Sequence, residues 1–447
     1  MIKKILIILI IIFTANSVFA WGWHNKCTTL KKPSVNLEFF NRFNDPYLAE
    51  YICEAYENNH DLKAAGYKVE QYRQQVKISF GQELPSLSTG AYFLGSHVPK
   101  YINTDLSNTS FVWPFIVSYE PDFFLKNHDK TKSFKKAYAA SQEDEKTIYI
   151  SLLSDVATSY INILQYDDLI EKQAKIVDIA SQQLTREQKK FRYGTIDTTD
   201  LSVAKQNLET ERNNLLSLQK QEETVLYGFA TLIGISPNNT KDIKRSKLSH
   251  FEYSEKIPNE IISDVIFSRP DVMSIENQLE EAKINVRVAR KELLPSFKIN
   301  GIWAFNTIAQ GSFFSWGNSL AAVLAGTSID LFKGGQKVAN VRLKKAMYEE
   351  MFEKYRQIDL NATKEVNNAL CVIKYDTAVD NNTQSKLQYQ TKIYANSQKK
   401  YGRGLIAYTE LIDMNKNLID MEQNKTKSKT IRLVNYVTLY KAVGGAL

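Results

Sequence analysis

The sequence is poor in the residues that interrupt regular structure. Its 447 residues contain only 18 glycines and 10 prolines, whereas a chain of several compact domains normally carries more turns. Two stretches, 127–193 and 336–401, contain neither residue. An uninterrupted helix of this length is about 100 Å long. The sequence therefore predicts two helices far longer than those of a globular domain.

Histidine and cysteine are also scarce. The five histidines are scattered, and no His-Glu-x-x-His, nucleophile-elbow or phosphate-loop pattern is present. The three cysteines show no metal-ligand spacing and allow at most one internal disulfide, with Cys27 and Cys53 as the candidate pair. Gly334-Gly335 is better interpreted as a strand-to-helix turn than as a nucleotide cradle. We therefore expect no enzyme, no cofactor and no metal site.

The formal net charge is +8, but the charge is not gathered in one place. Lysine and arginine are spread among glutamate, aspartate and glutamine along the chain. A nucleic-acid partner would favour a basic patch or stripe. We therefore expect no nucleic-acid binding.

The N-terminus has the features of a secretory signal peptide. Lys3 and Lys4 precede the apolar run 5–13, and small residues end at Ala20, which predicts cleavage after Ala20. The alternative, a membrane anchor, needs about 20 apolar residues and is disfavoured by the polar residues before Ala20. Cys27 invites a lipoprotein interpretation, but the small residues that should precede a lipidated cysteine are missing. Beyond Ala20 no apolar run approaches a membrane-spanning length, so any insertion of the mature chain must use β-strands.

An internal repeat has a constant offset of 210 residues. The segment 188–194 resembles 398–404, and Leu84-Pro85-Ser86 corresponds to Leu294-Pro295-Ser296. One register kept over this distance indicates two tandem copies. The predicted organisation is a signal peptide, an N-terminal segment, a first repeat, a polar linker and a second repeat, over residues 1–20, 21–44, 45–235, 236–257 and 258–447.

Each copy shows the same order of predicted elements. One helix of about 35 residues should open at Asp45-Pro46 and end at Leu-Pro-Ser. A strand pair, a long helix and a shorter return helix follow. Residues 297–306 alternate with period two, and the stretches 111–122 and 319–332 are apolar, as in tilted membrane strands. Four strands cannot close a barrel in lipid, whereas three copies would supply twelve.

The chain resembles the outer-membrane efflux protein family, the TolC-like channels, and most of all the branch that serves resistance-nodulation-division (RND) pumps. Beyond the repeat, the resemblance rests on several short motifs in family order: Ser268-Arg269-Pro270-Asp271-Val272, Leu294-Pro295-Ser296, Asp330-Leu331-Phe332, Gly334-Gly335, Tyr401 with Gly404, and the ending 439–445. The resemblance implies a homotrimer with a 12-stranded β-barrel in the outer membrane and a long α-helical barrel in the periplasm. It also implies docking to a periplasmic adaptor and an inner-membrane RND-type pump.

The resemblance places function at the helix-to-helix turns. It implies that these tips meet the adaptor and close the resting channel, at Gly194, Thr195, Ile196, Tyr401, Gly404 and Leu405. Three acidic residues are gate candidates: Glu410 and Asp413 align with the family's constriction, and Asp200 is the repeat equivalent of Glu410. The alternative is a solvated acidic face at a helix start. In the family a basic residue near the tip helps to hold the channel closed. Ile406 occupies that position here, so Arg403 and Arg192 are the candidates for this role.

Aromatic residues in the predicted strands suggest contact with lipid. Phe93, Trp113 and Trp303 are expected to face the outer-membrane lipid, although a soluble β core is the alternative. The predicted function is a passive outer-membrane conduit gated at its periplasmic tip. The alternative is a periplasmic coiled-coil adaptor without a pore, which should carry a single helical hairpin rather than a duplicated one.

Overall fold

The computed structural model describes residues 35–96, 108–253, 263–306, 314–330 and 332–446. The predicted signal peptide and Cys27, with its proposed pairing to Cys53, lie outside these residues. The elements follow one another as α2 (Glu38–Asn41), α3 (Pro46–Asn58), α4 (His60–Gly81), β1 (Ser86–Thr89), β2 (Tyr92–Ser96), β3 (Asn108–Tyr119), α5 (Lys126–Arg192), α6 (Thr198–Ile233), η1 (Pro237–Asp242), η2 (Leu248–His250), α7 (Ser263–Phe267), α8 (Pro270–Lys291), β4 (Ser296–Asn306), η3 (Trp316–Asn318), β5 (Ser319–Ser328), α9 (Gln336–Gly402) and α10 (Tyr408–Ala442).

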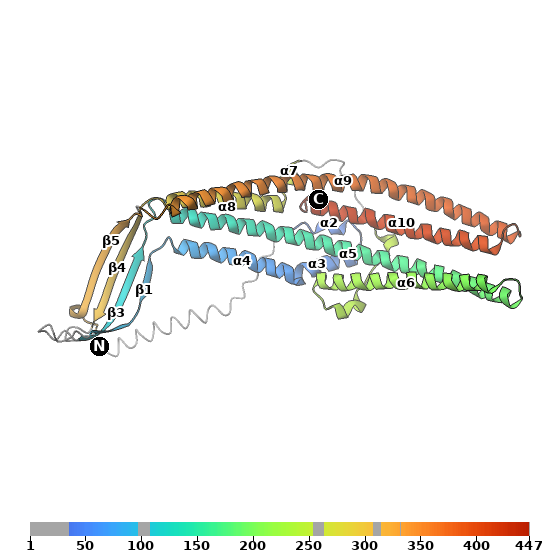
Figure 1. Cartoon of the computed structure of the whole chain (residues 1–447), viewed down its shortest axis with the longest axis horizontal. Coiled ribbons are helices and arrows are strands. Elements are labelled where there is room, and N and C mark those ends of the chain that lie inside the picture. Colours follow the sequence, from blue (N-terminus) through green and yellow to red (C-terminus); the bar gives the residue numbers. More distant parts are fainter. Residues whose placement is uncertain (1–34, 97–107, 254–262, 307–313, 331, 447) are drawn as a thin grey trace. The chain divides into compact units, whose positions relative to one another are not determined.

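The two long helices confirm the prediction from the glycine- and proline-free stretches. Helices α5 and α9 each have 67 residues. Their bounds are related by the 210-residue offset of the sequence repeat, and so are those of α4 and α8. Helix α5 packs against α4 and α6, while α9 packs against α8 and α10 (Figure 1). Each long helix therefore runs beside two shorter ones, as expected.

Local capping explains where the long helices begin. Leu125 and its repeat equivalent Gly335 both precede a long helix with positive φ, 56° and 78°, a conformation that glycine adopts freely. In the first copy the Asp122 carboxylate accepts hydrogen bonds from the backbone N–H groups of Lys126 and His128, at 2.6 and 2.8 Å. These bonds satisfy donors that have no partner within the helix.

The prediction of one helix between Asp45 and Leu84 is wrong. The chain leaves helical geometry at Asn59, with φ −58° and ψ 132°, and this divides α3 from α4. The Asn59 side chain accepts hydrogen bonds from Asp61 N and Leu62 N at 2.8 and 3.1 Å and donates to the carbonyl of Leu232 at 2.9 Å. Asn59 thus caps α4 and ties it to the end of α6. These hydrogen bonds compensate for the helical hydrogen bonds that are lost at the break.

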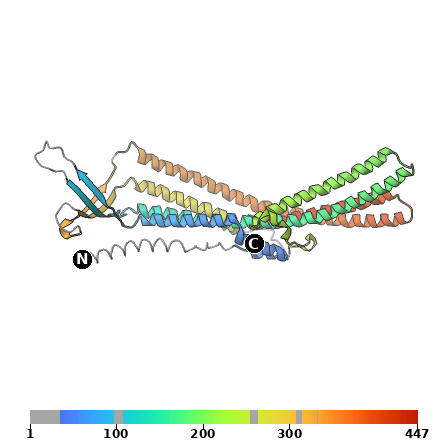
Figure 2. The ribbon, with the colours of Figure 1, turned by 90° about the horizontal axis from the view of Figure 1, so that it is seen from below.

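The main hydrophobic core lies where α2, α3, α5, α6 and α10 meet, midway along the helices (Figure 2). Phe39 stacks on Tyr440 with ring centroids 4.4 Å apart. The segment predicted as a polar linker also contributes, because Leu248 and Phe251 are buried in this core. Burial of such side chains stabilises a fold by about 1.5–3 kcal/mol each. The described part of the linker is therefore packed rather than a solvated tether.

A second connection ties the start of α8 to the middle of α9 and the end of α10. The buried Arg269 guanidinium forms ion pairs with Asp271 and Glu365 at 2.7 and 2.8 Å. It also donates to the carbonyl of Ala442 at 2.7 Å. Pairing and hydrogen bonding together offset the cost of burying the charge.

The strands form one antiparallel sheet with the order β1-β3-β4-β5, and β2 also pairs with β3. Pairing continues in the same register from Thr89 opposite Phe115 to Tyr92 opposite Val112. Strands β1 and β2 are therefore one strand position interrupted at residues 90–91. The four strand positions expected from the sequence are confirmed, and in the described chain the outer edges, β1/β2 and β5, have no strand partner.

Candidate functional site

Two helix-to-helix turns, defined as residues 193–197 and 403–407, end the long helices opposite the sheet (Figure 1). Gly194 and Gly404 have φ of +66° and +74°, so the side chain of any other residue would be strained there. In each turn the residue after the glycine donates its N–H back into the helix: Thr195 to Lys190 O at 3.0 Å, and Leu405 to Lys400 O at 2.9 Å. This is the Schellman arrangement, and it reverses the chain tightly.

The predicted residues fall in two groups: Gly194, Thr195 and Ile196 lie in the first turn, and Gly404 and Leu405 in the second. Tyr401 lies at the end of α9, just before the second turn. All of them are exposed except Ile196, which is half-buried: Gly194, Thr195, Ile196, Tyr401, Gly404 and Leu405. The exposed large apolar side chains among them are those of Tyr401 and Leu405.

The two turns differ in how the next helix begins. Asp197 caps α6, because its carboxylate accepts hydrogen bonds from Thr199 N and Asp200 N at 2.8 and 2.9 Å. These bonds hold the pKa of Asp197 below its usual value. Its repeat equivalent Ala407 provides no such bond to α10. This cap was not predicted from the sequence, although an aspartate two residues before a Thr-Asp pair is a recognisable signal.

The acidic candidates lie just beyond these turns. Glu410 and Asp413 are exposed one turn apart on the same face of α10, and Asp200 is exposed at the start of α6. Within the described residues none of the three forms an ion pair.

An arginine does join the two hairpins near the turns, but it is not one of those expected. The Arg186 guanidinium of α5 lies over the ring of Tyr408 on α10, with its carbon 3.2 Å from the ring centroid. The Tyr401 ring lies 5.7 Å from that of Tyr408. Arg192 and Arg403 are exposed and have no ion pair among the described residues. The contact crosses between repeats, so sequence spacing could not reveal it.

Polar contacts continue along this seam between α5, α6 and α10. Glu211 pairs with Lys416 at 3.1 Å and accepts a hydrogen bond from Gln173 at 2.9 Å. Gln423 donates to the Gln173 side-chain oxygen at 3.2 Å. Burial alone would raise the pKa of Glu211. The hydrogen bonds from Gln173 and Lys416 outweigh this effect, so the pKa lies below its usual value. Between the aromatic core and the turns, polar contacts thus join these three helices.

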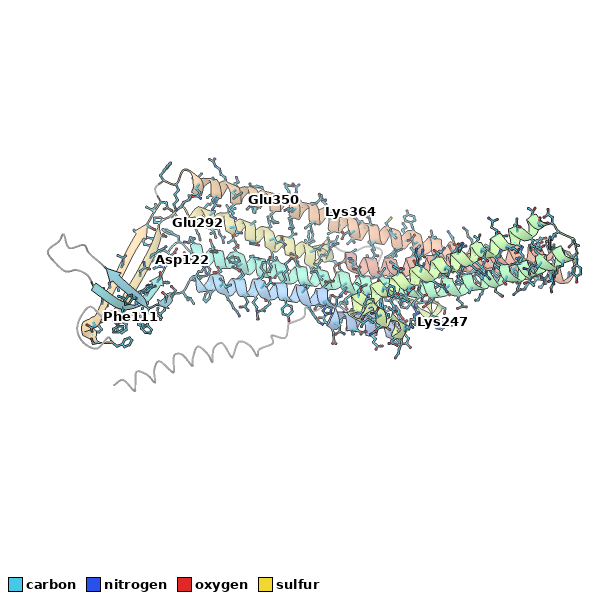
Figure 3. The ribbon with its side chains drawn as sticks, turned by 60° about the horizontal axis from the view of Figure 1, so that its bottom comes forward. Phe111, Asp122, Lys247, Glu292, Glu350 and Lys364 are labelled. Atoms are coloured by element: carbon cyan, nitrogen blue, oxygen red, sulfur yellow. The ribbon has the colours of Figure 1, made fainter. Side chains whose placement is uncertain are left out.

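The three predicted lipid-facing aromatics share one face of the sheet. In the register, Phe93 is opposite Phe111, Trp113 opposite Phe305, and Phe115 opposite Trp303. Side chains alternate between the faces of a strand, so these residues project together. Figure 3 shows Phe111 among the strands, with Asp122 and Glu292 where strands pass into helices.

Other features bear on what the chain can do. In the part of the chain that the structure describes, no three His, Cys, Asp or Glu residues are grouped so as to hold a metal. Helix α5 contains an apolar stretch long enough to cross a membrane, but most of it is buried within the protein. We therefore assign α5 to the core of the helical part.

Comparisons with known proteins agree with this geometry. The Outer membrane efflux protein family matches residues 51–234 and 261–445. The chain is 26% identical over 431 residues to "Probable outer membrane lipoprotein SilC" of Salmonella typhimurium, covering 91% of this chain and 87% of the relative. It is 25% identical over 424 residues to "Cation efflux system protein CusC" of Escherichia coli K12, covering 90% and 87%.

Solved structures show the same fold. The Campylobacter jejuni CmeC outer membrane channel superposes with a TM-score of 0.85 at 22% identity, covering 94% of this chain and 90% of that one. The open state of the Neisseria gonorrhoeae MtrE outer membrane channel gives 0.79 at 22% identity, covering 90% of each. The chain belongs to the outer membrane efflux protein family and is an efflux channel of the outer membrane.

Proposed function

We propose that three copies of this chain form a closed tube, the outer-membrane conduit of a tripartite efflux system. The open edges of the sheet, β1/β2 and β5, carry this proposal. In lipid an unpaired strand edge leaves backbone polar groups without partners, and closure removes both edges. Three chains with four strand positions each supply twelve strands, enough for a barrel with a lumen.

The surface of α9 supports assembly. Several large apolar side chains along this helix are exposed in the single chain: Leu343 (51%), Leu360 (65%), Tyr375 (62%) and Tyr389 (63%). A row of this kind on one helix is typical of a surface covered by another subunit. A neighbouring copy can provide this cover. The threefold rotation that pairs β5 of one copy with β1/β2 of the next also brings the adjoining helices together.

The turns supply the docking surface for the rest of the system. The exposed side chains of Tyr401 and Leu405, with Thr195 and Ile196 in the other turn, form the ends that a periplasmic adaptor would contact. An inner-membrane pump of the RND type, reached through that adaptor, supplies the cargo. Related channels are named for cations, solvents and pyoverdine, which fits a passive conduit whose selectivity lies in the pump.

The acidic residues form the gate. Threefold symmetry would set three copies of Glu410 and three of Asp413 around one axis, with Asp200 contributing from the other hairpin. Carboxylate rings attract cations, and like charges at close range oppose one another's ionisation. The lumen end near the turns should therefore favour cations.

Membrane fractionation and cross-linking test this function. The protein should be recovered in outer membranes, and native mass spectrometry in detergent should give a mass of three chains. A photo-cross-linker at Leu405 should capture the adaptor, whereas one at Leu216, exposed far from the turns on α6, should not. Recovery in the soluble periplasm as a monomer would instead support an adaptor-like protein without a pore.

A further inference from the structure

The face of the sheet that carries Trp303 contains an apolar groove of about 520 Å³. Its floor is Gly301 on the inner strand β4, and the register sets Val117 and Val323 on either side. A Cβ atom at Gly301 would meet only the Cβ of Val117, at 3.9 Å. The groove therefore exists because this position has no side chain. Phe115 and Trp303 form the adjacent wall.

A second cavity, of about 230 Å³, lies where the strands pass into the helices. Phe123 packs edge-to-face on Phe297 at its apolar side, with ring centroids 5.0 Å apart. Its polar side combines ammonium and carboxylate groups from Lys126, Lys291, Lys337, Glu120, Glu292 and Asp330. Figure 3 shows Glu292 and Asp122 at this junction.

Strand β4 connects the two cavities. Phe297 and Gly301 are four residues apart on the same face of β4, which is about 13 Å along a strand. Half of the hydrocarbon core of a bilayer is about 15 Å thick. An acyl chain lying along this face would therefore reach from the groove to the charged junction.

We infer that groove and junction together bind one zwitterionic phospholipid of the inner leaflet, with its acyl chain over Gly301 and its headgroup at the junction. This inference rests on the outer-membrane location, which sets the sheet in lipid and the junction at the periplasmic surface. Strand β4 is paired on both sides, so a neighbouring copy that pairs at β1/β2 or β5 leaves Gly301 uncovered.

The charges at the junction select the headgroup. Each lysine already has an acidic partner: Lys126 pairs with Glu120 at 2.6 Å, Lys337 with Asp330 at 3.0 Å, and Lys291 with Asp129 at 2.6 Å. The lining is therefore mixed rather than basic. A phosphate with an attached ammonium finds partners of both signs, whereas an anionic headgroup brings no cation for the carboxylates and adds a negative charge beside them. The site thus favours an ethanolamine headgroup over a glycerol one.

Two glycine variants separate this site from general contact with lipid. Gly301→Leu fills the groove. Gly326→Leu adds the same side chain to β5, at a position paired with Lys298 on the opposite face of the sheet, where a Cβ meets nothing within 4 Å. Native mass spectrometry of the detergent-purified assembly, after incubation with phosphatidylethanolamine or phosphatidylglycerol, counts the lipid retained per chain.

The original protein and Gly326→Leu should retain phosphatidylethanolamine in preference to phosphatidylglycerol. Gly301→Leu should bind it about tenfold more weakly, a loss of ~1.4 kcal/mol. If Gly301→Leu prevents assembly, the smaller Gly301→Val should give the same direction of change. Equal retention by all variants, equal loss in Gly326→Leu, or no preference between the two lipids would overturn the site. A three-chain assembly that forms but retains no lipid would reject the site alone and leave the channel proposal intact.

Discussion

Arg186 of the first repeat lies over the ring of Tyr408 in the second, 3.2 Å from its centroid. Both residues lie near the turns, where the α5–α6 and α9–α10 hairpins meet. A cation–π contact at an exposed position stabilises by about 0.5–1 kcal/mol, and a trimer would contain three of them. The contact is therefore suited to hold two hairpins together while allowing them to separate.

Replacing Arg186 should favour an open tip. We expect Arg186→Ala to raise the open probability of the channel in a planar bilayer, because three contacts of about 0.5–1 kcal/mol each are lost. Arg212→Ala is the matched control, since Arg212 is exposed on α6 and pairs within its own helix, with Glu209 at 2.8 Å. The contact has no role in closure if both variants gate like the original protein.

The acidic gate should bind multivalent cations. Replacing both Glu410 and Asp413 by alanine should reduce block of the reconstituted channel by such ions, because two of the three proposed carboxylate rings are removed. The control changes Glu350 and Glu353, exposed on α9 far from the turns. Unchanged block in the tip variant would show that these carboxylates do not line the constriction.

A pair of carboxyl groups at the root of the α5–α6 hairpin should make stability depend on pH. Burial, together with the nearby Glu222 carboxylate, raises the pKa of Asp167 to about 6, although Arg245, 3.3 Å away, acts in the opposite direction. A folded pKa above the ordinary value of 3.8 for an aspartate means that the folded state binds the proton more tightly. Asp167 therefore contributes stability at low pH that is lost as pH rises through about 6.

The raised pKa of Asp167 predicts how replacing this residue changes the melting temperature. Asp167→Asn removes the charge whose burial is costly, so it should raise the melting temperature above pH 7 and change it less below pH 4. Asp178→Asn, at an exposed position on the same helix, should show no such dependence. Melting curves by circular dichroism at several pH values measure the effect. A lower melting temperature for Asp167→Asn at pH 8 would mean that the ion pair with Arg245 dominates instead.

The buried Arg269 should be critical for the join between α8, α9 and α10. Arg269→Ala leaves the Ala442 carbonyl without its donor, and a hydrogen bond from a charged group contributes about 1.5–3 kcal/mol. The acidic partners Asp271 and Glu365 are partly exposed, at 34% and 51%, so the loss of their ion pairs adds less. The assembly should therefore melt at a clearly lower temperature, whereas Arg342→Ala, exposed on α9, should leave it nearly unchanged. Equal melting of the two variants would contradict this role.

The sequence was sufficient where one residue type determines a local conformation. The absence of glycine and proline predicted α5 and α9, Gly194 and Gly404 marked the turns, and period-two alternation predicted β4. These features depend on neighbours in the chain, so a linear pattern contains them.

Features that depend on distant contacts were not predictable in the same way. Asn59 breaks a helix because its side chain caps α4 and bonds to Leu232, and Phe251 is buried although its segment is polar overall. The Arg186–Tyr408 contact and the groove at Gly301 likewise require the packing of both repeats or the register of three strands. No local sequence pattern identifies the distant residues that take part in these contacts.

Single-channel recording from the purified protein tests the central claim most directly. Inserted into a planar bilayer, the assembly should give discrete conductance steps of uniform size, and closing the tip by cross-linking the turns should abolish them. Protein that is correctly folded and inserted but shows no conductance steps, even for Arg186→Ala, would contradict the account of this chain as a gated channel.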